Sequence, residues 1–117
     1  MRRVKRTAVI VIPKQPYIDW ANAIDEDGVQ IGEDFWPENN VYLIDDVADI
    51  VPFDRKAIVQ PYFQTIFEEE LNGWYRLESA WPAHRTFEVF LAWFEFDVHS
   101  MVIDLPGSRL IRTESYY

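Results

Sequence analysis

The chain contains no cysteine and only two histidines, His84 and His99. The absence of cysteine excludes disulfide bonds, thiolate catalysis and cysteine-ligated metals. A zinc site needs several Cys or His ligands at short spacings, and two isolated histidines do not supply them. The sequence therefore predicts no metal site.

Glycine is also scarce, with four residues at positions 28, 32, 73 and 107. This spacing excludes the glycine-rich phosphate loops of dinucleotide- and nucleotide-binding proteins. The acidic segment that begins at Asp25 fails the EF-hand pattern, because Gly28 falls at position 4 of the loop where position 6 is required. Neither a G-x-S-x-G elbow nor an H-E-x-x-H motif is present, so we expect no cofactor and no enzyme of these classes.

Long hydrophobic runs are missing as well. The N-terminus is basic and then apolar, like a signal peptide, but its apolar run, Ala8–Ile12, is short and ends at Pro13. A membrane span needs about 20 apolar residues. We therefore interpret this run as a first strand and expect a cytoplasmic protein that has no contact with membranes.

Basic residues are few, with 11 against 20 acidic residues and a net charge of −9. Four of the bases fall in the first six residues, which leaves an acidic body. An acidic body repels phosphate backbones, so the composition disfavours nucleic-acid binding. Solubility is the simplest reason for the charge, and mimicry of a nucleic acid is the alternative.

Aromatic residues are abundant, at 16% of the chain with five tryptophans. Large rings bury much area each, which predicts either a well-filled core or an aromatic surface patch used for association. A length of 117 residues favours one domain, residues 1–117.

Apolar periodicity divides the N-terminal two thirds into alternating strands and helices. The predicted elements are a strand at Thr7–Ile12, a helix at Pro16–Ile24, a strand at Val41–Ile44 and a helix from the cap Asp54 to Trp74. Pro61 should kink or divide the last helix. The segment Asp25–Asn40 predicts a loop with a short strand at Val29–Ile31.

Helix 54–74 also carries an unexpected acidic run. One apolar stripe of this helix contains Phe63, Ile66, Phe67 and Glu70. Glu70 and the two acids before it lie near the negative end of the helix dipole, which is unfavourable. From the sequence alone, bases on a partner are the one explanation for this placement.

The segment from Trp81 to Leu105 changes from a helical to a strand-like pattern. Thr86 is a helix cap in front of a stripe at Phe87, Phe90, Leu91 and Phe94, and a strand follows at Val98–Leu105. Pro106-Gly107 predicts a type II turn, with a returning antiparallel strand at Arg109–Thr113. The order β-α-β-α-α-β-β predicts an α+β fold with a mixed four-stranded sheet and helices packed mainly on one face.

Three polar residues near this strand are candidates for chemistry. If the strand begins early, Glu95, Asp97 and His99 share one face. A histidine beside carboxylates can act as a general base, which gives the hypothesis of a small hydrolase or lyase. A histidine at the edge of an apolar face is more often structural, so we do not assign catalytic residues.

Association features are stronger than catalytic ones. Trp74 and Trp81 lie near element ends, where full burial is difficult, and aromatic residues are enriched in interfaces. With Arg85 they are the candidate binding residues. The alternative is that both rings cover the core between the second and third helices.

Four stretches between residues 67 and 105, a segment of about a third of the chain, resemble a family of small uncharacterised bacterial proteins. They are FEEELNGWY (67–75), WPAHRT (81–86), FLAWF (90–94) and VHSMVIDL (98–105). The resemblance implies a self-contained bacterial cytoplasmic domain and transfers no activity. Its polar members, Arg85, His99, Ser100 and Asp104, are the first places to look for a site.

The sequence assigns no specific function. It favours a non-enzymatic binding or regulatory domain that acts through protein–protein contacts and forms a homo-oligomer. The alternatives are the hydrolase or lyase and the acidic nucleic-acid mimic.

Overall fold

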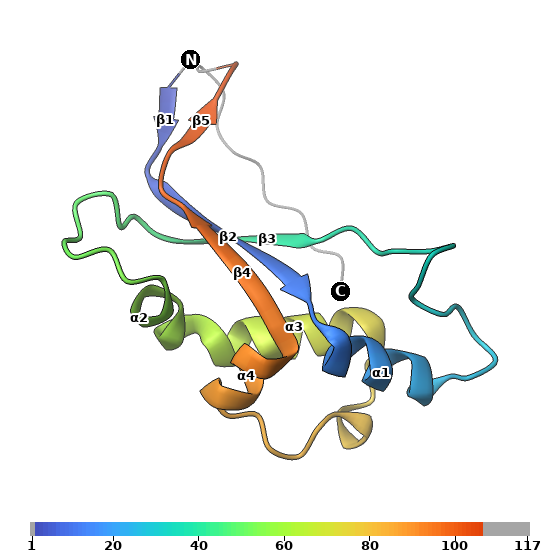
Figure 1. Cartoon of the computed structure of the whole chain (residues 1–117). Helices are drawn as coiled ribbons and strands as arrows, with labels where there is room; N and C mark the ends of the chain where they lie inside the picture. The colour runs from blue at the N-terminus through green and yellow to red at the C-terminus, as the bar shows by residue number, and fades with distance from the viewer. Residues whose placement is uncertain (1, 107–117) are drawn as a thin grey trace.

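A computed structural model describes residues 2–106 of the chain, which form an α+β fold (Figure 1). In chain order the elements are β1 (Arg2–Val4), β2 (Arg6–Pro13), α1 (Gln15–Ile24), β3 (Asn40–Asp45), α2 (Arg55–Val59), the 3₁₀ turn η1 (Gln60–Tyr62), α3 (Phe63–Trp74), the 3₁₀ turn η2 (Glu78–Ala80), α4 (Phe87–Trp93), β4 (Phe94–His99) and β5 (Val102–Asp104). The predicted fold class is confirmed.

The strands form two sheets, and the predicted mixed four-stranded sheet is wrong. A three-stranded sheet has the order β3-β2-β4, and β1 pairs with β5 in a separate two-stranded arm. Every one of these pairs is antiparallel. The predicted strand Arg109–Thr113 lies outside the described residues.

The antiparallel order follows from the path between β2 and β3. A parallel neighbour would require the chain to return to the start of β2. Here α1 carries the chain away and the loop 25–39 brings it back to the end that β2 left, so that Asn40 pairs with Val11. The predicted strand Val29–Ile31 does not form. Instead, the Asn22 side chain holds the Ile31 backbone, accepting from its N–H at 2.8 Å.

The predicted last strand, Val98–Leu105, is divided in two. β4 begins earlier, at Phe94, and a break at Ser100–Met101 separates it from β5, which leaves the main sheet for the arm. The basic N-terminal residues Arg2–Val4 supply the other strand of the arm. Arg3 fixes the base of the arm, because its guanidinium donates to Asp46 at 2.6 Å and to the Ser100 carbonyl at 2.9 Å.

Local helix signals are confirmed. The Asp54 carboxylate accepts from the Lys56 and Ala57 amides at the start of α2, and the Thr86 hydroxyl accepts from Val89 at the start of α4. The helix predicted for 54–74 is divided into α2 and α3 by a 3₁₀ turn that contains Pro61.

The helices cover one face of the β3-β2-β4 sheet (Figure 1). On that face Thr7, Val9 and Val11 of β2 are fully buried. Below them the aromatic residues form the core, with Phe67 in edge-to-face contact with Phe94 at a centroid distance of 5.4 Å. Most of the aromatic content therefore fills the core.

Candidate functional site

Within residues 2–106, no helix covers the second face of the β3-β2-β4 sheet, which we call the open face (Figure 1). Cross-strand pairing places Leu43 beside Ala8, and Val41 beside Ile10, on this open face. Val41 is 58% exposed and Leu43 is 49% exposed. Val41 and Leu43 of β3 thus present an apolar stripe to solvent, whereas their β2 neighbours are half-buried at Ile10 and buried at Ala8. An antiparallel sheet commonly leaves one face in water, but that face usually carries polar side chains.

The candidate residues Glu95, Asp97 and His99 border the stripe on the same open face. Because β4 begins at Phe94, alternation places all three on one side, with Asp97 opposite Ile10 and Glu95 opposite Ile12. All three side chains are exposed. Exposure leaves a histidine solvated, whereas catalysis by a histidine depends on a shaped and partly desolvated pocket. Their catalytic role stays a prediction.

The open face is small and acidic on one side. Three strands about 4.8 Å apart, each about six residues long, cover roughly 280 Å². A globular partner commonly buries about 800 Å² on each side of an interface. The face therefore matches a single secondary-structure element in size.

The predicted binding residues lie at the other end of the molecule. The indole N–H of Trp74 donates to the Ala21 carbonyl at 3.0 Å, and that of Trp81 donates to the Tyr75 carbonyl at 2.7 Å. Both rings pack partly buried against the core. Arg85 lies over the Trp81 ring, 5.6 Å from its centroid. This packing corresponds to the lid that was the alternative interpretation, and a role in binding stays a prediction.

The remaining polar residues of the family resemblance lie along the arm. The carbonyl of Ser100 accepts from Arg3, and Asp104 faces Arg2 in the strand register. They contribute to the arm rather than to a pocket.

Sequence reasoning missed a buried carboxylate at Glu70, which is 6% exposed. The Tyr42 hydroxyl and the Asn40 side-chain amide both donate to its Oε2 at 2.5 Å. The Tyr17 hydroxyl donates to the backbone carbonyl of Glu70 at 2.9 Å. Burial raises the pKa of Glu70 above its ordinary value of 4.5, and the hydrogen bonds from Tyr42 and Asn40 act in the opposite direction.

The pKa values of the Tyr17 and Tyr42 hydroxyls are raised as well. Burial is the larger cause, and the charge of Glu70 adds to it. The sequence signal for this cluster was the position of Glu70 in the apolar stripe of α3. A glutamate in such a stripe needs internal donors, because an unpaired buried carboxylate is very costly. Tyr42 and Asn40 supply these donors, so no partner is needed to explain Glu70.

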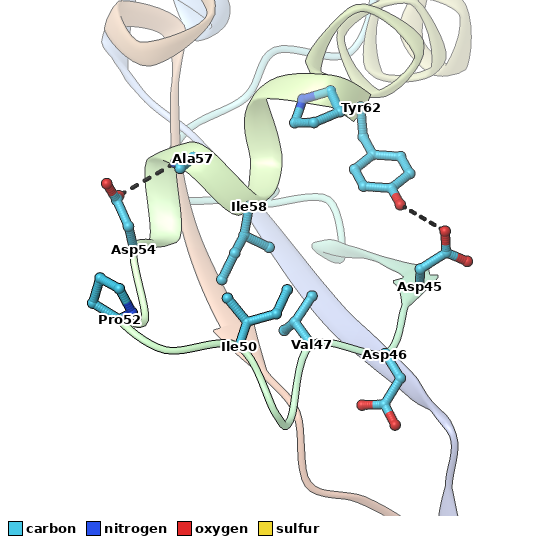
Figure 2. A pocket seen from close by; sticks show the side chains of 10 residues that line it. Asp45, Asp46, Val47, Ile50, Pro52, Asp54, Ala57, Ile58 and Tyr62 are labelled. Carbon is cyan, nitrogen blue, oxygen red and sulfur yellow. Dashed lines mark hydrogen bonds between the residues drawn. The ribbon is translucent and has the colours of Figure 1, made fainter.

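A hollow of about 300 Å³ lies between the end of β3 and α2 (Figure 2). Val47, Ile50 and Ile58 point toward one another across it, and carboxylates stand at its rim. Each rim carboxylate already has a structural contact. Asp46 pairs with Arg3, Asp54 caps α2, and Asp45 accepts from the Tyr62 hydroxyl at 3.3 Å. These contacts give each rim carboxylate a structural role, so we do not assign chemistry to the hollow.

Among residues 2–106, no three His, Asp or Glu side chains are gathered closely enough to hold a metal ion. Over the same range, no helix combines the length and the apolar character that crossing a bilayer requires. Comparison of the chain with protein-family models, curated proteins and solved structures gave no match. The resemblance to uncharacterised bacterial proteins therefore stays a prediction.

Proposed function

We propose that the chain is a cytoplasmic, non-enzymatic protein-binding domain whose open sheet face binds an amphipathic helix with apolar and basic side chains. The exposed stripe formed by Val41 and Leu43 carries this proposal, because exposed contiguous apolar surface marks sites of association.

An amphipathic basic helix fits the open face in both size and charge. A helix about 10 Å wide covers most of three strands, and about four turns match their length. Glu95 and Asp97 line one side of the stripe, so basic residues on the flank of the helix would meet opposite charge.

A second copy of the chain fits this face poorly. Two sheets packed face to face lie about 10 Å apart, and apolar stripes in register would bring the two Glu95–Asp97 edges toward each other. Each chain also carries a net charge of −9. The predicted homo-oligomer would therefore use another surface.

The test is a titration with a synthetic helical peptide of leucine and lysine, followed by backbone amide shifts and calorimetry. We expect the peptide to bind, and the same peptide with glutamate for lysine to fail. Leu43→Ser should weaken binding about tenfold, since it removes a half-buried apolar contact. Leu77→Ser is the matched control, because Leu77 is exposed at 58% in a different region.

Three results would overturn the proposal. The first is no binding of the basic peptide at millimolar concentration. The second is equal weakening by Leu43→Ser and Leu77→Ser. The third is a dimer that Leu43→Ser converts to a monomer, because the occupant of the face would then be a second copy. The hydrolase and nucleic-acid mimic hypotheses stay predictions, and no specific observation favours either.

A further inference from the structure

A groove of about 700 Å³ lies beside β4, on the side away from β3, and gathers bases in an acidic protein. Its lining residues are Lys14, Pro52, Phe53, Asp54, Arg55, Lys56, Leu91, Phe94, Glu95 and Phe96. Three of them are basic and two are acidic, whereas the whole chain has 11 bases and 20 acids. The volume falls within the range of about 300–1,000 Å³ that is common for small-molecule sites.

Backbone carbonyls of the groove hold two of the bases in place. The Lys14 ammonium donates to the Leu91 carbonyl at 3.1 Å, and the Arg55 guanidinium donates to the Phe96 carbonyl at 2.7 Å. Arg55 also lies 5.3 Å from the centroid of the Phe96 ring. A lysine has three N–H donors and an arginine has five, so both retain donors for a ligand.

None of the three bases has a carboxylate partner within the described part of the chain, where the ion pairs join Arg3 to Asp46 and Arg85 to Glu78. The carboxylate of Asp54 is engaged as the cap of α2. The lining of the groove thus has a formal net charge of +1, from three bases and two acids, and its bases form no ion pair among the described residues. Aromatic and aliphatic side chains complete the lining.

We infer that this groove binds a small organic carboxylate with an aromatic or aliphatic body. The carboxylate would accept from Arg55, Lys56 and Lys14, and the apolar body would lie against Phe53 and Leu91. Addition of a peptide strand to β4 fits less well, because Arg55 already occupies the Phe96 carbonyl.

The negative charge of Glu95, at the rim of the groove, repels a bound carboxylate. A variant of Glu95 should therefore change the affinity in the opposite direction to a variant of a base. Removal of its charge by Glu95→Gln should tighten binding, whereas removal of a base should weaken it. This inference does not depend on the helix-binding proposal. Glu95 borders both sites, but Arg55 and Lys56 line the groove only, and Leu43 belongs to the stripe only, so variants of these residues test the two sites separately.

The experiment uses the full chain and 2-naphthoate as the probe, with calorimetry and backbone amide shifts as readouts. We expect saturable binding at one site, with shifts at residues 52–56 and 91–96. Lys56→Met and Arg55→Met should each weaken binding about tenfold, as expected for one charge-assisted contact. Arg76→Met is the matched control, because it removes one base from outside the groove and should leave affinity unchanged.

A comparison with a neutral ligand separates the outcomes. The alcohol 2-naphthalenemethanol should bind at least about tenfold more weakly than 2-naphthoate, because it lacks the charge. Equal binding of the alcohol, equal weakening by Arg76→Met, or no binding of 2-naphthoate at millimolar concentration would each overturn the inference. Lys56→Met keeps the test valid if Arg55→Met unfolds, since α2 is held by Asp54 through backbone amides.

Discussion

Replacement of Tyr42 by phenylalanine removes one hydroxyl from the cluster around Glu70 and leaves the aromatic ring in place. The hydroxyl donates to Glu70 at 2.5 Å, and a hydrogen bond to a charged group contributes about 1.5–3 kcal/mol. When Glu70 is protonated, the lost contact is a neutral one worth about 0.5–1.5 kcal/mol. We therefore expect Tyr42→Phe to destabilise the fold more at high pH than at low pH.

The raised pKa of Glu70 determines whether folding stability rises or falls with pH. Because its pKa is higher in the folded than in the unfolded chain, the folded state binds more protons, and stability falls as pH rises above the ordinary value of 4.5. Tyr42→Phe removes a donor that lowers this pKa, so the fall becomes larger. Glu70→Gln keeps an acceptor for Tyr42 and Asn40 and removes the titration, so the part of the pH dependence that comes from Glu70 should disappear.

The assay is urea unfolding followed by tryptophan fluorescence, at about pH 4 and about pH 8, with each variant compared with wild type at the same pH. The control is Tyr62→Phe, whose hydroxyl contacts the exposed Asp45 at 3.3 Å and should contribute less than about 0.5 kcal/mol. A loss for Tyr42→Phe that equals the control, or that is the same at both pH values, would refute the reasoning.

Two further predictions concern other contacts. Thr7 is fully buried, and its hydroxyl accepts from the Val47 amide at 3.0 Å. Thr7→Val leaves that N–H unpaired and should lower the free energy of unfolding, measured in urea, by about 1–3 kcal/mol. A loss below about 0.5 kcal/mol would contradict this prediction. The hydrogen bond from Arg3 lowers the pKa of Asp46 to about 2, from 3.8, so the arm should be stabilised above pH 3.8 and lose this contribution as pH falls through about 2. In Asp46→Asn the amide shifts of the arm should no longer change over this interval, and an unchanged acid response would count against the pairing.

Local signals in the sequence were sufficient for the helices. Asp54 and Thr86 cap their helices through side-chain contacts two or three residues ahead, and Pro61 interrupts a helix because it lacks an N–H. These effects depend on neighbours in the chain, so they can be read without knowledge of the fold.

Long-range pairing could not be read in the same way. β1 is three residues long and mostly basic, and only its pairing with β5 makes it a strand. The direction of β3 depends on where a 15-residue loop returns, which no residue pattern in that loop specifies. The sequence did place Glu95, Asp97 and His99 on one face, because strand alternation is itself a local rule.

The Glu70 cluster could be predicted only in part from the sequence. The position of Glu70 in an apolar stripe was visible in the sequence, but its donors come from β3, which is distant along the chain. The groove bases also come from distant segments, Lys14 and Arg55–Lys56. Both sites therefore depend on tertiary folding rather than on sequence spacing.

The pairing of β2 with β4 has a consequence for synthesis of the protein. The central strand β2 is synthesised long before its partner β4, because Val9 pairs with Val98. At about 5–20 residues per second, this wait lasts roughly 5–20 s. During that time the apolar strand β2 lacks one of its two neighbouring strands. Unpaired apolar strands of this kind tend to aggregate or to bind chaperones. The β3-β2-β4 sheet is thus completed only after β4 has been translated.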